Sequence, residues 1–529
     1  DLADFARPDL QIGAGLLDVT GTLATGDIPA VDLAVAAELA GVTFDDPGLQ
    51  QAIGESLTAS TRITWTEGDP VEMRGLDLRG TGYSAQADAE LASGGGTTIL
   101  TTEGRAELED LSRFALLTGQ DLSGAAELGF DISADLLGGS FAVSAEGGTR
   151  DLALGIERLD PVIGGDATLE VSVNRSLDGI TLDAFRLSND EIRLSASGSV
   201  ANDDGRIAYD ARLRNSGAFT GVEGGPIALT GEVLRDGETF TVTLDGGGRD
   251  LATGIAQADA LLRGEAEVSA QLTLDERIVL NRADIVTPAM DIRAGGELTE
   301  GARNITVTGR VFDSGALTGT PGGPLDAQVV VQQSGADHVV TLEGTAVDLR
   351  TGVAQADALL RGRTEIAGRA RIGAPMLLER LEVSNEALTA RAEGNLTDGA
   401  RDVTLTVRLT DSGAPLGGSG GPLDARISAV QDGAGYLLDL AGTVRNLGTG
   451  QALADSLLAG DTAFSASGRF EDGRLRLDAT RVDGLSVSAS ASGVVAEGAT
   501  ALDLSARLAS LAGVVPQAPA GPVTASGMP

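Results

Sequence analysis

Short runs of alternating apolar and polar residues make up most of the chain. Between positions 305 and 311, for example, Ile305, Val307 and Val311 fall on one side of an extended segment. A period of two is typical of a half-buried β-strand with one apolar face. The same pattern selects a set of residues that we expect on one apolar face, namely Ile207, Leu213, Ile305, Val307, Val311, Val403, Leu405, Leu409, Leu502 and Leu504.

The connections between these runs are of two kinds. Turn-forming stretches such as 203–205 and 397–399, each ending in Gly, predict tight links between successive strands. The segment 250–264 differs, because its apolar residues recur at helical spacing and it closes with Gly264. We therefore expect mostly β-structure with occasional short helices.

The helical segment recurs along the chain with a fixed period. Its first glycine is found at Gly155, Gly254, Gly352 and Gly450, which are 98 or 99 residues apart. Two further landmarks keep that period: a Ser-Gly-Ala followed by Gly-Gly-Pro, and an alternating strand that ends in Gly. A unit of this kind cannot bury its apolar face alone, and stacking on its neighbours solves that problem.

The period predicts a mostly all-β fold, an elongated repetitive sheet in which each repeat stacks on its neighbours. It comprises about five repeats of roughly 98 residues, each with one short helix. The expected boundaries are a partial repeat at 1–39, a diverged repeat at 40–150, repeats at 151–249, 250–347 and 348–445, and a truncated repeat at 446–529.

Composition excludes several classes of function. The chain carries 38 basic and 77 acidic residues, a net charge of −39, so it would be repelled by nucleic acid. All of the basic residues are Arg, and there is no Cys for disulfides or thiolate metal sites. We expect no cofactor and no enzymatic activity. Gly417–Gly421 matches the serine-hydrolase motif around Ser419, but neither this segment nor the single histidine, His338, has the surroundings that catalysis needs.

Several phrases of the sequence resemble the TamB (translocation and assembly module) family of the AsmA-like group. They are residues 107–124, 177–200 and 377–396, and the acidic, Lys-free style is similar to alphaproteobacterial members. The resemblance implies that the sheet is periplasmic and is rolled, like a taco or a β-solenoid, into a hydrophobic groove. The same resemblance implies that an N-terminal helix anchors the protein in the inner membrane. It also implies contact with an outer-membrane barrel of the TamA type through a C-terminal part. We recognise neither the anchor nor that C-terminal part here, so we expect this chain to be the periplasmic shaft.

The resemblance implies a role in phospholipid transport between the two membranes of a Gram-negative bacterium, with a linked role in outer-membrane protein assembly and secretion. We therefore expect acyl chains on the apolar face and no nucleic-acid partner. The alternative is a secreted, acidic, repetitive adhesin or surface structural protein whose repeats form filled cores without a groove. Alternating apolar residues suit both, and a continuous dry groove would distinguish them.

Overall fold

The computed structural model describes residues 2–6, 10–201, 203–219, 221–496, 499–510 and 522–527. Most of these residues are in β-strands, as the alternating pattern predicts. The chain divides into two compact units, Asp1–Glu276 and Arg277–Pro529. This division falls inside the repeat expected at 250–347, so the compact units and the sequence repeats are different partitions of the chain.

The N-terminal unit contains the strands β1 (Leu2–Ala6), β2 (Leu10–Thr25), β3 (Pro29–Phe44), β4 (Ser56–Thr66), β5 (Val71–Gly80), β6 (Tyr83–Gly94), β7 (Thr97–Leu108), β8 (Ser123–Asp135), β9 (Phe141–Ala153), β10 (Asp166–Ser176), β11 (Gly179–Ser188), β12 (Ile192–Ala201), β13 (Asp204–Leu213), β14 (Ile227–Asp236), β15 (Thr239–Arg249) and β16 (Glu265–Leu274). Its helical segments are α1 (Pro47–Ile53), η1 (Leu111–Phe114), α2 (Ala115–Thr118), α3 (Asp160–Ile163), η2 (Ser216–Phe219) and α4 (Ala256–Leu261).

The C-terminal unit contains β17 (Ile278–Val286), β18 (Met290–Glu297), β19 (Asn304–Val311), β20 (Leu325–Ser334), β21 (Asp337–Val347), β22 (Arg363–Ile372), β23 (Leu377–Ser384), β24 (Leu388–Asn395), β25 (Asp402–Leu409), β26 (Leu423–Asp432), β27 (Gly435–Arg445), β28 (Asp461–Glu471), β29 (Arg474–Asp483), β30 (Val487–Ala496), β31 (Ala499–Leu508) and β32 (Val523–Gly527). Its helical segments are α5 (Gly315–Thr318), α6 (Ala354–Leu359), η3 (Ala414–Leu416) and α7 (Ala452–Leu457).

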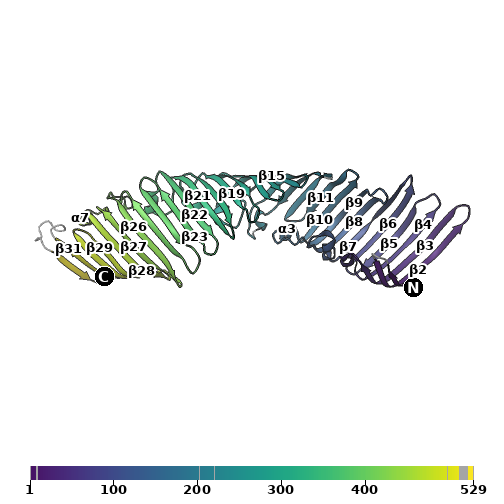
Figure 1. Cartoon of the computed structure of the whole chain (residues 1–529), viewed down its shortest axis with the longest axis horizontal. Helices are drawn as coiled ribbons and strands as arrows, with labels where there is room; N and C mark the ends of the chain where they lie inside the picture. Colours follow the sequence, from purple (N-terminus) through teal and green to yellow (C-terminus); the bar gives the residue numbers. More distant parts are fainter. Residues whose placement is uncertain are drawn as a thin grey trace. The chain divides into compact units, whose positions relative to one another are not determined.

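Within each unit, every strand pairs antiparallel with the strand that follows it in sequence (Figure 1). Among the described residues, no late strand of either unit pairs back with an early one, so each sheet is open.

Consecutive antiparallel pairing makes all odd-numbered strands of a unit run in one direction. Every helical segment follows an odd-numbered strand, so within a unit these segments gather at one end of the strands. We call that end the helical rim and the opposite end, which has the tight turns, the hairpin rim.

The prediction of one short helix per repeat is wrong, because a full period contains two helical segments. In the period that begins at α6, the second segment is η3, which forms part of the Ser-Gly-Ala landmark. Its counterparts are η2 and α5. These segments are only three or four residues long and rich in small residues. They are too short to show helical periodicity in the sequence.

Hydrogen bonds accepted by the side chains of Asp348 and Asn446 explain the most recognisable repeat motif. Asp348 has a φ of 50°, and its Oδ1 accepts a hydrogen bond from the Gly362 N–H at 2.8 Å. Asn446 holds the equivalent place, with a φ of 51° and the same bond to Gly460. Asp and Asn tolerate this left-handed conformation better than most residues. The fixed spacing therefore closes a loop around α6 and around α7.

The Ser-Gly-Ala and Gly-Gly-Pro landmark is held by a second carboxylate. Oδ1 of Asp313 accepts from the N–H groups of Gly315 at 2.7 Å and Gly322 at 2.8 Å. A Cβ on Gly323 would lie 2.0 Å from the carbonyl oxygen of Val347, so no other residue fits there without moving the backbone. The landmark thus ties the loop around α5 to the end of β21.

The third landmark is a glycine opposite a β-bulge. Gly296 and Gly493 have φ values of 136° and 140°, a region open to glycine but not to residues with a side chain. The strand before each of them, β17 and β29, carries a register shift typical of a bulge. Each period therefore contains one bulged strand, and the repeated glycine accommodates it.

Fully buried residues are concentrated at the helical rim. In the N-terminal unit, Val162 and Ile163 of α3 are only 1% and 2% exposed and pack with Leu187, Ile192 and Leu213. The middle of most strands has no such cover, and its apolar side chains are half-buried. The helical segments therefore close one end of the sheet and leave the central face open.

Candidate functional site: the apolar face of the sheets

An uninterrupted row of apolar and glycine residues crosses twelve consecutive strands of the N-terminal unit. Each member lies directly opposite the next in the strand register, so their side chains share one face. From β5 to β16 the row is Leu76, Ala87, Gly104, Phe130, Ala145, Val171, Phe185, Ala196, Tyr209, Gly231, Leu244 and Ala270. At about 4.8 Å per strand the row extends roughly 50 Å.

A similar row crosses the C-terminal unit and contains three of the candidates from the sequence, Val307, Leu405 and Leu504. From β17 to β31 the row is Ala283, Ala294, Val307, Val329, Leu342, Gly368, Leu381, Ala392, Leu405, Ile427, Leu440, Ala466, Thr480, Ala491 and Leu504. Its one polar side chain is Thr480. The sequence pattern therefore places these three candidates on one continuous face.

Four further candidates lie in the row next to the central row of their own unit, each beside a landmark glycine. Ile207 lies opposite Gly198, and Ile305 lies opposite Gly296. The other two pairs are Val403 with Gly394 and Leu502 with Gly493. All four side chains are half-buried. They widen the apolar face by one row toward the hairpin rim.

The remaining three candidates occupy a different environment. Leu213, Val311 and Leu409 are 6%, 8% and 7% exposed and lie at the ends of their strands at the helical rim. Leu213 belongs to the cluster that packs against α3. Alternation shows only on which side of a strand a residue lies. It could not distinguish these covered positions from the open positions on the same side of the same strand.

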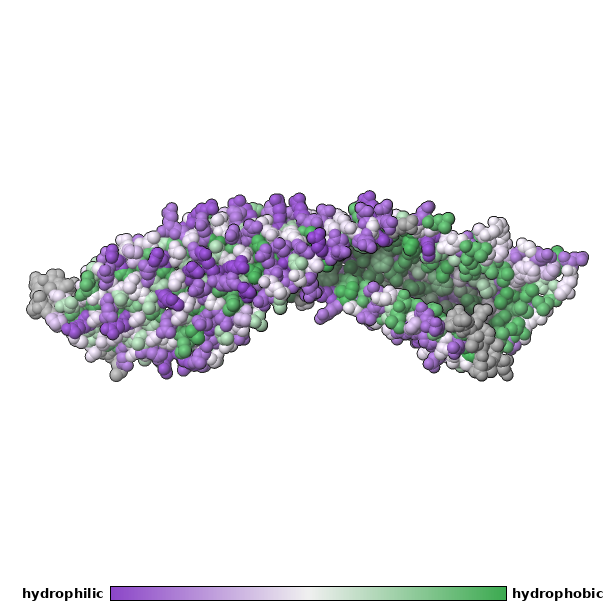
Figure 2. Space-filling model, viewed as in Figure 1, coloured by the Kyte–Doolittle hydropathy of each residue, from purple (hydrophilic) through white to green (hydrophobic). Residues whose placement is uncertain are grey.

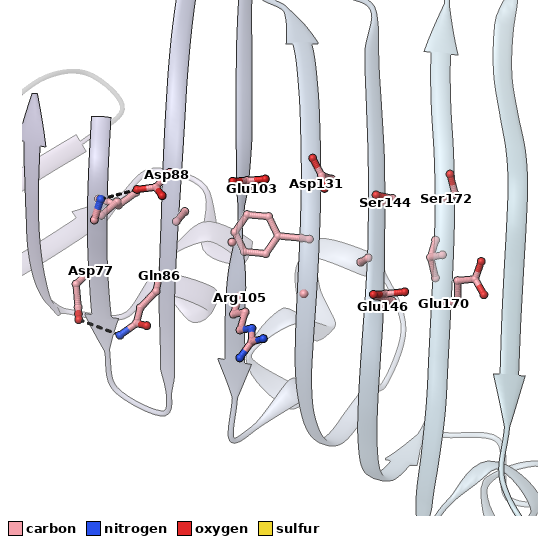
Figure 3. Close-up of a pocket in the computed structure, with 18 residues that line it drawn as sticks. Asp77, Gln86, Asp88, Glu103, Arg105, Asp131, Ser144, Glu146, Glu170 and Ser172 are labelled. Atoms are coloured by element: carbon pink, nitrogen blue, oxygen red, sulfur yellow. Dashed lines mark hydrogen bonds between the residues drawn. The ribbon is translucent and has the colours of Figure 1, made fainter. Parts of the chain in front are cut away.

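The residues that line a cavity of about 1090 Å³ across β5 to β10 include six members of the first row, from Leu76 to Val171. Three consecutive residues of each strand line it, and the middle residue of each triplet belongs to the apolar row. The flanking residues are largely polar, and Figure 3 shows them in two lines, one running from Asp88 through Glu103 and Asp131, the other including Glu146 and Glu170. Because side chains alternate along a strand, these lines belong to the face opposite the apolar row.

The polar face carries acidic residues in adjacent positions. Glu103 lies directly opposite both Asp88 and Asp131, and Glu146 lies opposite Glu170. Like charges in such positions repel each other, so they weaken the sheet slightly. They also keep other sheets from stacking on this face.

Arginine neutralises part of this charge through exposed ion pairs. Arg62 of β4 contacts Asp32 of β3 at 2.6 Å, and its hydrogen bond lowers the pKa of the Asp32 carboxyl. Arg408 and Asp424 form an equivalent cross-strand pair, also at 2.6 Å. Exposed pairs of this kind contribute little to stability, because water and salt screen the two charges. They reduce the repulsion between neighbouring carboxylates on the polar face.

Figure 2 shows a hollow in the N-terminal unit, on the right of the view, whose visible lining is largely hydrophobic. The described strands of that unit supply half-buried apolar residues from β4 to β16. The side of the C-terminal unit in the same view is mainly hydrophilic. Each strand thus separates an acidic exterior from an apolar face.

Residues with catalytic or metal-binding chemistry are not brought together in the described part of the chain. His338 is the second residue of β21, at the hairpin rim, whereas Ser419 is exposed in the loop after η3, at the helical rim. A Ser–His pair is therefore not formed. Among the described residues no group of three or more His, Asp or Glu could hold a metal ion. The same residues include no helix with the length and apolar character needed to cross a membrane.

Alternation with Ile207 and Leu213 already places Tyr209 on the apolar face, but the sequence did not identify the other aromatic residues of the apolar rows, notably Phe130 and Phe464. They occur singly in otherwise aliphatic strands, and the alternation that identifies a face says nothing about cross-strand partners. The register shows that Phe130, Tyr209 and Phe464 each lie opposite a glycine, and that Phe464 is one row nearer the helical rim than the central row. The regular distance along the sequence between successive strands was the signal that could have indicated these pairs.

In comparisons with known proteins, no family model and no curated protein matches the chain.

Proposed function

We propose that the apolar face carries phospholipid acyl chains, with no catalytic step. The observation that supports this most directly is the unbroken row of half-buried apolar and glycine residues across β5 to β16. Each CH₂ removed from water contributes about 0.8 kcal/mol. Because the row repeats similar side chains on each strand, a chain would meet similar free energies at successive positions and could slide.

The resemblance to TamB proteins supports extending this proposal to the cell. We propose a periplasmic bridge in a Gram-negative bacterium, anchored to the inner membrane and working with an outer-membrane barrel of the TamA type. A linked role in outer-membrane protein assembly and secretion belongs to the same proposal. The acidic polar face suits a bridge that stays in water, because its charge opposes self-association.

Mass spectrometry of lipid that co-purifies with the chain tests the proposal. We expect phospholipid with the wild-type chain and a strong loss with Leu405→Arg, which places a charge on the apolar row. The matched control is Thr404→Arg, one residue earlier on the same strand, whose side chain faces the opposite side beside Glu393. A wild-type chain that carries no phospholipid would contradict the proposal and leave the adhesin alternative.

A further inference from the structure

Three glycines of the apolar faces lie directly opposite aromatic residues and are covered by them. The pairs are Gly104 with Phe130, Gly231 with Tyr209, and Gly442 with Phe464. A Cβ on Gly442 would lie 2.3 Å from Cζ of Phe464, and a Cβ on Gly104 would lie 2.8 Å from Cζ of Phe130. Each ring therefore occupies the space that a side chain on the glycine would need.

Tyr209 shows how flat these rings lie. Its hydroxyl donates a hydrogen bond to the carbonyl oxygen of Thr243 at 2.8 Å. Tyr209 is on β13 and Thr243 is on β15, so the side chain crosses the intervening strand β14. A Cβ on Gly231 of β14 would lie 2.5 Å from the Tyr209 hydroxyl. The ring thus runs along the surface of the sheet instead of standing away from it.

A ring that stood upright would obstruct the apolar face. Aromatic side chains are the largest members of the central row and of the rows on either side of it. These rows otherwise consist of aliphatic residues, Thr and Gly. At these three positions the glycine partner lets the ring lie on the adjacent strand, so the ring does not stand out from the face there. The pairs occur in both units, in N-terminal strands β7–β8 and β13–β14 and in C-terminal strands β27–β28.

We propose that Gly104, Gly231 and Gly442 are positioning residues that hold their aromatic partners flat and so set the clearance available to the cargo. The inference rests on the proposed acyl-chain function and adds a specificity device to it: a level face favours slender, flexible hydrocarbon chains. Covering a glycine with a ring also stabilises a sheet. If the three glycines had only a structural role, substituting them would lower the thermal stability. Lipid binding would then not depend on where the aromatic ring lies.

The test compares Gly442→Ala with the double variant Gly442→Ala/Phe464→Leu in the whole chain. Both variants place the same methyl group 2.6 Å from the carbonyl oxygen of Asp424, so both have the same backbone strain. Only the single variant has a displaced ring. Native mass spectrometry would measure phospholipid per chain, and thermal unfolding would confirm folding. We expect the single variant to bind phospholipid about tenfold more weakly than the wild type, which corresponds to the loss of about two methylene contacts. We expect the double variant to recover the binding.

Equal lipid binding by the single and double variants would overturn the inference. A wild-type chain without lipid would instead contradict the proposed function, so the two failures are distinguishable. If Gly442→Ala does not fold, Tyr209→Phe provides a second test without a new clash, because it only removes the bond to Thr243. We expect about two- to fivefold weaker binding, the scale of one hydrogen bond, and recovery in Tyr209→Leu. Binding by Tyr209→Phe equal to that of the wild type would overturn the inference there.

Discussion

Oδ1 of Asp357 accepts hydrogen bonds from both the backbone N–H of Thr351, at 2.6 Å, and the Thr351 hydroxyl, at 2.9 Å. Asp259 with Thr253 and Asp455 with Thr449 repeat the arrangement. The Asp is thus the link between α6 and the loop that precedes it. This recurring link, made by a charged group, makes the stability of the helical rim dependent on pH.

The Thr351 N–H, together with the Thr351 hydroxyl, lowers the pKa of Asp357 below its ordinary value of 3.8. A lowered pKa in the folded state means that this carboxylate stabilises the fold above pH 3.8 and that the contribution is lost as the pH falls through the lowered value. We expect Asp357→Asn to be less stable than the wild type at pH 7, with the difference shrinking below pH 4. Thermal unfolding of both proteins from pH 7 to pH 3 measures it, and a constant difference would contradict the prediction.

The effect of a substitution at Asp348 on the free energy of unfolding should depend on how well the new residue tolerates a positive φ. The chain itself places Asn446 at the equivalent position, so Asp348→Asn should change the free energy of unfolding by less than about 0.5 kcal/mol. Asp348→Val loses the bond to Gly362 and forces a β-branched residue into a left-handed conformation, at a cost of about 1–3 kcal/mol. Chemical denaturation of the two variants tests this, and equal stability would show that the loop does not need the Asp or Asn side chain.

Gly323→Ala should be among the most damaging single substitutions. The added Cβ would lie 2.0 Å from the Val347 carbonyl oxygen, so the loop and β21 must separate. We expect a loss of about 3 kcal/mol or more. Gly94→Ala is the matched control, because no atom lies within 4 Å of its Cβ and its φ is not positive. Similar melting temperatures for the two variants would contradict this account of the Gly-Gly-Pro landmark.

Leu409 and Leu405 are on the same strand and the same side, yet truncation should affect them differently. Leu409 is 7% exposed at the helical rim, so Leu409→Ala should cost about 2–5 kcal/mol. Leu405 is half-buried on the open face, and Leu405→Ala should cost less. Lipid binding should change in the opposite order, with Leu405→Ala the weaker binder. Denaturation and lipid mass spectrometry on the same samples would show whether the two roles separate.

The repeat and the apolar face could be predicted from the sequence because both depend on local regularities. The period follows from Asp348, Asn446 and the glycines that they bond, and the face follows from alternation at Val307 and Leu405. The second helical segment could not be predicted, since η3 has only three residues. Nor could the burial of Leu213, which depends on the distant α3. The pairing of Tyr209 with Gly231 required the strand register, which the turns alone did not determine.

The number of strands per period has a consequence for how such a chain can change in length. Six strands, β22 to β27, separate α6 from α7, and six is even, so each period begins and ends at the same rim. Adding or removing one whole period would keep every helical segment at the helical rim and every apolar residue on its face. A change by an odd number of strands would transfer the following helices to the opposite rim. Evolution by duplication can therefore adjust the reach of this protein in increments of one period without redesigning any contact.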